Sequence, residues 1–276
     1  MNQPATSALT AQRSRVTVTT LRKMKREGEK IAMLTAYDAS FARVLDAEGV
    51  DIILIGDSLG MVIQGHATTI PVSTDDIIYH TKAVAAANEH ALVMADLPFM
   101  SYTSPEMALR NTARLMQEGN AHMVKLEGGA PQVETVRQLV HHGVPVCAHL
   151  GLQPQSVHKL GGYRVQGRDE AVAQQMLEDA LALQRAGADL LILECVPVAL
   201  AKQITDELFI PVIGIGAGGD CDGQVLVLYD MLGITPRAPR FSKDFMQEGR
   251  RIPQAIGAYV AAVKDGSFPA EEHCFV

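Results

Sequence analysis

Ionisable side chains stand at the ends of five successive apolar runs in this 276-residue chain. In sequence order they are Asp57, Asp96, the pair Lys125 and Glu127, His149, and Glu194. Burying a charged group without a partner is costly, so their recurrence at equivalent points indicates a shared site. Carboxylates, an ammonium group and an imidazole gathered at one place are able to hold a cation, bind an anionic substrate and transfer a proton.

The carboxylates of Asp57, Asp96 and Glu127 point to a metal site. Three acids crowded together repel one another unless a cation or a proton neutralises them. Their hard oxygen atoms favour Mg²⁺ or a similar ion, with coordination positions left open for substrate and water. Each acid taken singly is equally consistent with a turn residue or a helix cap. No Cys or His spacing typical of a zinc site is found in the sequence.

The remaining ionisable residues each allow two interpretations. Lys125 and Glu127 alternate along one run and point to the same side, which suits either an ion pair or the binding of an anionic substrate. His149 is either a core histidine or a group that orients a hydroxyl or a water. Glu194 lies between a leucine and a cysteine, and such an apolar setting favours a base that works near neutral pH.

Eight apolar runs alternate with helical patterns, and these elements must position the site. The runs cover residues 31–34, 51–55, 91–95, 122–126, 144–148, 190–193, 211–215 and 225–228, and the helical patterns cover residues 40–48, 73–89, 104–117, 132–142, 169–186 and 198–208. Near-continuous apolar runs are typical of strands covered on both faces. We therefore predict an α/β fold, a (β/α)8 TIM barrel, whose active site lies where the carboxyl ends of the strands meet.

The chain ends extend this barrel. A helix at about residues 21–27 is expected to close the bottom, and one or two further helices are expected within residues 241–265. The connection at residues 216–224 is too short and too rich in glycine for a helix. We expect a flexible leader at residues 1–15 and a single catalytic domain at residues 16–276, because no composition shift marks a linker.

Composition limits the classes of binding partner and the cell compartment that we expect. The chain has 24 basic and 31 acidic residues, a net charge of −7, which argues against a nucleic acid or an anionic membrane as the main partner. No apolar run approaches the ~18 residues of a membrane span. The four scattered cysteines do not form a disulfide framework, so we expect the cytoplasm. The pattern Gly214, Gly216, Gly219 lacks the following helix of a dinucleotide site and indicates a flexible loop.

Longer motifs surround the strand ends in order along the chain. They are Thr-Ala-Tyr-Asp from residue 35, Gly-Asp-Ser-Leu-Gly-Met from 56, Gln-Gly-His from 64, Ala-Asp-Leu-Pro-Phe-Met from 95, Val-Lys-Leu-Glu-Gly-Gly from 124, His-Leu-Gly-Leu-Gln-Pro-Gln-Ser from 149, Gly-Gly-Tyr-Arg-Val-Gln-Gly from 161, Leu-Glu-Cys-Val-Pro from 193 and Gly-Ile-Gly-Ala-Gly from 214. With these motifs the chain resembles the ketopantoate hydroxymethyltransferase family over about residues 17–276. Two departures are the polar leader and the segment 235–240, Thr-Pro-Arg-Ala-Pro-Arg, which differs from the Gly-rich version associated with the family.

The resemblance implies a defined reaction. A hydroxymethyl group passes from methylenetetrahydrofolate to 3-methyl-2-oxobutanoate, and the product is ketopantoate, on the route to pantothenate and coenzyme A. The reaction needs a proton removed beside a ketone, and Mg²⁺ that binds the carboxylate and keto oxygens would stabilise the resulting enolate. The resemblance also implies a homo-oligomer, a decamer.

The resemblance assigns roles to residues of this chain. Asp57 and Asp96 would bind Mg²⁺ directly, Glu127 would complete the metal site through water, and Glu194 would accept the proton. The oxo acid would contact Asp57, Ser58, Asp96, Lys125 and His149. No aromatic cluster marks a folate site, and the candidates are Phe99, Tyr102 and Tyr163.

Two other functions fit the same residues less well. One is a Mg²⁺-dependent lyase or mutase of the phosphoenolpyruvate mutase and isocitrate lyase barrels, which share metal and oxo-acid binding. It is disfavoured because no reactive cysteine lies in an acid-rich loop. The other is a non-catalytic oligomeric scaffold, which would leave the residues at the strand ends idle.

Overall fold

Eight apolar segments form the parallel strands of a closed barrel in the computed structural model, which describes residues 13–276. The strands are β1 (Ile31–Thr35), β2 (Ile52–Ile55), β3 (Leu92–Asp96), β4 (Met123–Glu127), β5 (Val146–Gly151), β6 (Leu190–Glu194), β7 (Val212–Ile215) and β8 (Gly223–Leu226). Each strand pairs with the next, and β8 closes the ring against β1. Every strand residue except Glu194 is buried, as expected for strands covered on both faces. The predicted TIM barrel is confirmed.

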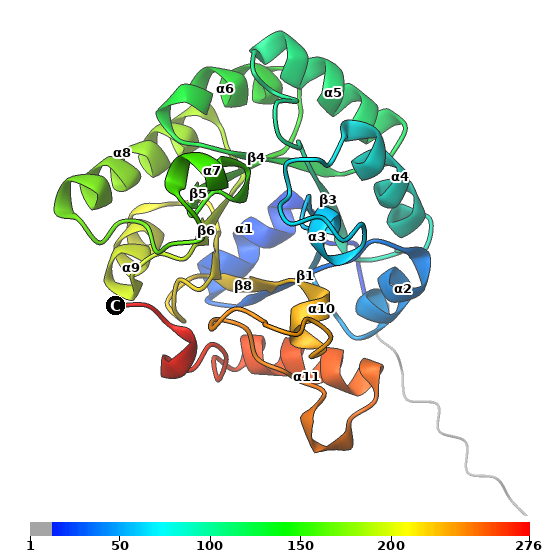
Figure 1. Cartoon of the computed structure of the whole chain (residues 1–276). Coiled ribbons are helices and arrows are strands. Elements are labelled where there is room, and N and C mark those ends of the chain that lie inside the picture. Colours follow the sequence, from blue (N-terminus) through cyan, green and yellow to red (C-terminus); the bar gives the residue numbers. More distant parts are fainter. Residues whose placement is uncertain (1–12) are drawn as a thin grey trace, which may run out of the picture.

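Helices surround the strands in sequence order (Figure 1). The outer ring contains α2 (Ala39–Ala47), α4 (Thr74–Ala85), α5 (Pro105–Gln117), α6 (Val133–His141), α8 (Glu170–Ala186) and α9 (Val198–Glu207). Three shorter helices follow strands directly and belong to the loops at their carboxyl ends: α3 (Leu59–Val62), α7 (Val157–Leu160, after a short 3-10 turn) and α10 (Leu228–Met231). Within residues 13–276, no helix has the length and apolarity needed to cross a membrane.

The predicted N-terminal helix is α1 (Val18–Glu27), which lies at the centre of the ring in Figure 1. It buries Leu21 and Met24 against the bottom of the barrel. The Lys25 ammonium group lies 2.7 Å from the carboxylate of Asp222, just before β8. The helix therefore plugs the end of the barrel opposite the carboxyl ends of the strands.

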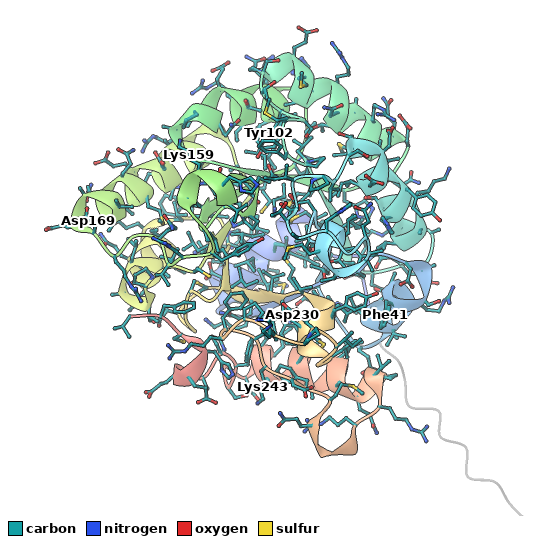
Figure 2. The ribbon with its side chains drawn as sticks, viewed as in Figure 1. Phe41, Tyr102, Lys159, Asp169, Asp230 and Lys243 are labelled. Carbon is teal, nitrogen blue, oxygen red and sulfur yellow. The ribbon has the colours of Figure 1, made fainter. Side chains whose placement is uncertain are left out.

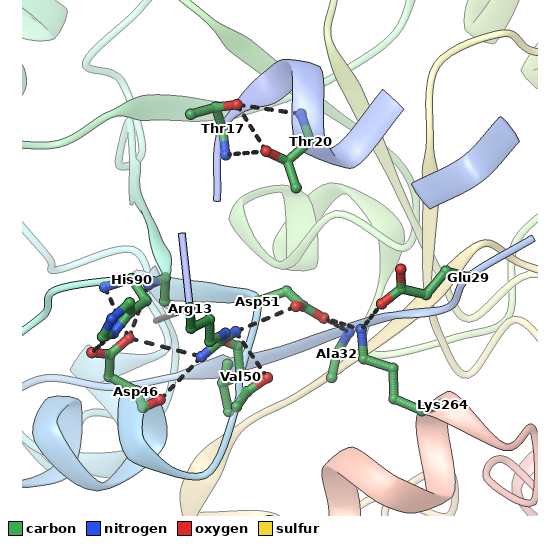
Figure 3. A network of polar contacts seen from close by, with 12 residues as sticks. Arg13, Thr17, Thr20, Glu29, Ala32, Asp46, Val50, Asp51, His90 and Lys264 are labelled. Atoms are coloured by element: carbon green, nitrogen blue, oxygen red, sulfur yellow. Dashed lines mark hydrogen bonds and ion pairs between the residues drawn. The ribbon is translucent and has the colours of Figure 1, made fainter. Parts of the chain in front are cut away.

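Polar contacts attach the segment before α1 to the same end of the barrel (Figure 3). The Arg13 guanidinium donates to the Val50 carbonyl oxygen at 2.7 Å and lies 3.4 Å from the Asp51 carboxylate. Asp51 also pairs at 2.7 Å with Lys264. Residues 1–12, most of the predicted leader, lie outside the described residues.

The C-terminal helix α11 (Ile252–Lys264) packs beside β1 and β8 (Figure 1). It follows β8 and α10 along the chain, and the connection between β7 and β8 contains no helix, as predicted. The helical pattern predicted from residue 241 begins only at Ile252, because Gly249 adopts a left-handed φ of 70° that interrupts a helix. Pro253 then occupies the first turn, where a proline is tolerated.

Replacing Tyr259 by Phe should destabilise the barrel. The buried Tyr259 hydroxyl lies 2.8 Å from the Met33 carbonyl oxygen and 2.9 Å from that of Gln224, so it joins α11 to both closing strands. Loss of this donor should lower the free energy of unfolding by about 1–2 kcal/mol. Urea unfolding measures the effect, and Tyr79→Phe, at a position 73% exposed, is the control that should leave stability unchanged.

Candidate active site

The carboxyl ends of the strands surround a cavity of about 730 Å³. All seven residues predicted for the site line it: Asp57, Ser58, Asp96, Lys125, Glu127, His149 and Glu194. They come from the ends of β2 to β6 and the turns that follow. The structure therefore brings together residues that are up to 137 positions apart, since 194 − 57 = 137.

Asp57 and Asp96 are neighbours across β2 and β3. The Asp57 amide donates to the Asp96 carboxylate at 2.9 Å. Gly56 leaves room beside this pair, because a Cβ there would stand 2.9 Å from the Ser58 hydroxyl oxygen and 3.5 Å from Asp96 Oδ2. Both carboxyl groups are buried and face the same part of the cavity.

Lys125 is an ion-pair partner inside the site. Its ammonium nitrogen lies 2.6 Å from Asp96 Oδ1 and 3.9 Å from Glu127 Oε1. Burial alone would lower the pKa of Lys125, but the carboxylates of Asp96 and Glu127 outweigh burial and raise it. The lysine is therefore a permanent positive charge that also lines the cavity, in reach of an anionic ligand.

His149 bridges two carboxylates. Its Nδ1 lies 3.5 Å from Glu127 Oε1, and its Nε2 lies 3.3 Å from Glu194 Oε2. Burial opposes the imidazolium, yet the adjacent carboxylates of Glu127 and Glu194 raise the pKa of His149 to about 9. The nearby His149 imidazole likewise lowers the pKa of Glu127 against the effect of burial. A positively charged His149 thus links the predicted metal site to the predicted base.

The end of β6 presents Glu194 to the cavity. Its side chain keeps 14% exposure, whereas the other acids of the site are almost fully buried. Gly151 makes room for the strand end, because a Cβ there would lie 2.2 Å from the Glu194 carbonyl oxygen. The next residue, Cys195, is buried, and burial raises the pKa of its thiol, so it stays protonated.

The charge balance of the site fits a divalent cation. Burial and the carboxylates of Asp96 and Glu127 raise the pKa of Asp57 well above its usual range, so negative charge is in excess there. Glu127 Oε1 is buried and accepts no hydrogen bond. Among residues 13–276, no group of three or more Asp, Glu, His or Cys side chains is placed so that it could hold a metal ion. Mg²⁺ commonly binds through one or two carboxylates together with water and substrate, so an open site suits it.

Gln155 belongs to the site and is missing from the sequence prediction. Its side-chain amide donates to Asp57 Oδ2 at 2.9 Å, and its backbone amide donates to Glu127 Oε2 at 3.1 Å. The Tyr102 hydroxyl, which lies on the β3–β4 side of the barrel (Figure 2), donates to Gln155 Oε1 at 2.5 Å. The prediction rested on ionisable residues at strand ends, and Gln155 is neutral, although it lies within the motif that begins at His149.

The three aromatic candidates for a folate site differ in their position relative to the cavity. Phe99 does not line the cavity, and Tyr102 is buried beneath Gln155. Tyr163 alone of the three lines the cavity, and its ring is half exposed. A further tyrosine, Tyr37, lies under the site, where its hydroxyl is 2.9 Å from the Ser58 hydroxyl.

Comparisons with known proteins agree on one family. Residues 15–271 match the family described as ketopantoate hydroxymethyltransferase. The 3-methyl-2-oxobutanoate hydroxymethyltransferase of Halorhodospira halophila is 61% identical over 260 residues, which cover 94% of each chain. The enzyme of the same name from Thiobacillus denitrificans is 62% identical over 94% of this chain and 99% of its own.

Solved structures show the wider fold relationship. A 2,3-dimethylmalate lyase, described as a member of the phosphoenolpyruvate mutase and isocitrate lyase superfamily, aligns with a TM-score of 0.56 and 17% identity over 78% of this chain and 79% of its own. A putative phosphonomutase from Burkholderia cenocepacia aligns with a TM-score of 0.62 and 19% identity over 78% and 93%. At such identities the likeness shows the barrel fold alone.

Proposed function

The chain belongs to the ketopantoate hydroxymethyltransferase family, and on this premise we propose how the residues of its cavity transfer a hydroxymethyl group to 3-methyl-2-oxobutanoate. The donor is methylenetetrahydrofolate, and the product is ketopantoate. One observation carries the assignment of roles: a paired acid site beside Lys125 shares its cavity with Glu194, the most accessible carboxylate of the site.

We propose that Asp57 and Asp96 hold Mg²⁺, with Glu127 completing the site through water. The bound ion would supply a Lewis acid that draws electrons from the keto oxygen and so acidifies the adjacent carbon. Lys125 and Ser58 bind the oxo acid, Lys125 through its ammonium charge and Ser58 through a hydroxyl oriented by Tyr37.

Glu194 takes the proton from carbon 3 of the oxo acid. The electron pair left on that carbon forms the new bond to the one-carbon unit, and the two C–N bonds that join this unit to the donor break. Water supplies the hydroxyl group, and the proton from carbon 3 and the second proton of water end on the two nitrogens of the tetrahydrofolate that leaves. His149, 3.3 Å from Glu194 Oε2, holds this carboxylate toward the substrate before the transfer. Its other nitrogen faces Glu127, so one imidazolium positions both the base and the metal site.

A lyase or mutase activity finds support only in the shared barrel fold. The cavity cysteine, Cys195, is held as a neutral thiol and is unsuited to acid–base chemistry near neutral pH. A substrate panel of oxo acids and phosphonates, followed by NMR without folate, tests this. We expect no bond cleavage, and cleavage of any member without a donor would overturn the proposal. A non-catalytic scaffold would show no Mg²⁺-linked oxo-acid binding by calorimetry.

Gln155→Met should weaken catalysis without unfolding the barrel. The substitution removes the amide that holds Asp57 and the acceptor of the Tyr102 hydroxyl, so the acid loses its orientation. We expect kcat/KM for the oxo acid to fall about tenfold or more, with a higher Mg²⁺ requirement. Gln153→Met, two positions earlier, is the matched control. Equal kinetics for both variants would remove the positioning role of Gln155.

We propose that the chain assembles into a homodecamer, as its family resemblance implies. Aromatic side chains are enriched at protein interfaces, and Phe209, which is 87% exposed, supports burial in an assembly. Light scattering should give ten times the chain mass of 29.7 kDa. A mass of one or two chains at micromolar concentration would refute the decamer.

We propose that the protein works in the cytoplasm. All four cysteines are free thiols, and three of them, Cys147, Cys195 and Cys221, are buried in the barrel. Free buried thiols are typical of proteins in a reducing compartment. Cell fractionation with an antibody to the chain tests the location.

A further inference from the structure

The cavity is larger than the oxo acid requires. Its volume of about 730 Å³ lies within the ~300–1,000 Å³ of pockets that enclose drug-sized ligands. A five-carbon oxo acid held by Asp57, Asp96 and Lys125 would occupy only the acidic floor. The space above that floor must therefore receive the second substrate.

Asp230 lies on the side of the barrel opposite Tyr102 (Figure 2), and the segment that contains it forms an apolar wall of the cavity. It is built by residues 229–241, which follow β8, and its apolar side chains Tyr229, Ile234 and Phe241 line the cavity. The Thr235 hydroxyl donates to Asp230 Oδ1 at 2.6 Å, which ties this segment to α10. Such a wall offers an apolar and aromatic surface to a flat ring system.

Two arginines of the same segment, Arg237 and Arg240, line the cavity at its exposed rim. Among residues 13–276, neither forms an ion pair with a carboxylate. Arg240 donates through Nε to the Glu272 carbonyl oxygen at 2.8 Å, and its guanidinium carbon lies 5.8 Å from the centre of the Phe275 ring. The terminal nitrogens of Arg240 and the whole Arg237 guanidinium remain available to an anion. Arg164 adds a third exposed guanidinium to the lining.

We propose that Arg237 and Arg240 bind the carboxylates of the glutamate tail of the folate donor. The inference rests on the proposed function, which requires the one-carbon end of the donor to reach the oxo acid near Glu194. The aromatic ring end then lies over the floor and the apolar wall, and the negatively charged tail points to the rim. Guanidinium groups bind carboxylates through paired hydrogen bonds, so the rim matches the tail in charge and in geometry.

The distribution of charge in the cavity supports this orientation of the folate donor. The floor carries an excess of carboxylates, which repel the tail, whereas the rim carries unpaired cations.

The test compares Arg237→Gln/Arg240→Gln with the control Arg26→Gln/Arg185→Gln, which removes two exposed charges elsewhere. Kinetics use the intact enzyme with donors that carry one or several glutamates. Two exposed charge contacts predict a rise of about tenfold in the donor KM, with kcat and the oxo-acid KM unchanged. In Arg237→Gln/Arg240→Gln, the rim variant, the donor KM should no longer fall as the glutamate tail lengthens, and it should no longer depend on salt.

Calorimetric titration with tetrahydrofolate separates this inference from the proposed function. If only the rim variant binds tetrahydrofolate more weakly, the subsite is supported, even when the enzyme forms no ketopantoate. Absence of ketopantoate formation would by itself defeat the proposed function. If the wild type forms ketopantoate, and the donor KM and the tetrahydrofolate Kd are the same in the rim variant and the control variant, the subsite is overturned and the proposed function stands. Equal losses in the two variants, or a loss confined to kcat, overturn it as well.

Discussion

Glu194→Gln is expected to abolish exchange of the carbon-3 proton of 3-methyl-2-oxobutanoate with solvent. The amide keeps the size of the carboxylate and still lies beside His149, but it cannot accept a proton. General base catalysis contributes about 10²–10⁴-fold, so kcat for ketopantoate formation should fall by at least that factor. NMR in D2O with Mg²⁺ and without folate follows the exchange directly.

Binding must persist for this result to have meaning. The variant should bind the oxo acid and Mg²⁺ as the wild type does, because Lys125, Asp57 and Asp96 are untouched. Glu207→Gln, at the end of α9 on the outside of the barrel, is the matched control and should exchange at the normal rate. Normal exchange in Glu194→Gln would remove Glu194 as the base.

Asp57→Asn is expected to separate stability from activity. Burial and the charges of Asp96 and Glu127 raise the pKa of Asp57, which means that the metal-free fold disfavours its ionised form. Removing this charge should leave the free energy of unfolding of the metal-free protein unchanged or higher. Activity should nevertheless fall roughly a thousandfold, because a lost metal ligand forfeits several kcal/mol of transition-state stabilisation.

The decisive readout is the effect of Mg²⁺ on thermal unfolding. Mg²⁺ should raise the Tm of the wild type through preferential binding to the fold, and it should leave the Tm of Asp57→Asn unchanged. Asp189→Asn removes a carboxylate at the opposite end of the barrel, where it pairs with Arg22, and should keep the Mg²⁺ effect. A wild-type Mg²⁺ shift that survives in Asp57→Asn would exclude Asp57 as a ligand.

The strands and the charged residues that end them were predictable from the sequence for one reason. A parallel barrel buries its strands on both faces, so each strand is an apolar run, and a charge at the end of a run must face the mouth. This rule places Asp96 at the end of β3 and Glu194 at the end of β6, as found. Strand β8 begins at Gly223, two residues before the predicted run, because glycine and glutamine lack an apolar signal.

The rest of the site depends on contacts between distant loops. Gln155 is neutral and follows a strand end by four residues, so nothing in its own position shows that it bonds to Asp57. Tyr37 supports Ser58 across two adjacent strand ends, and only the folded barrel brings the two hydroxyls within 2.9 Å. The rim arginines lie in an irregular segment with no period to read. Their contribution becomes visible only when residues 229–241 form a wall of the cavity.

Ketopantoate formation by the purified chain, assayed with and without Mg²⁺ and with and without methylenetetrahydrofolate, tests the central claim most directly. Full product formation is expected only when both are present, with chelation abolishing it and added Mg²⁺ restoring it. Formation of ketopantoate without the folate donor, or at an unchanged rate after chelation, would contradict the roles proposed for Asp57, Asp96 and Glu194 in the cavity.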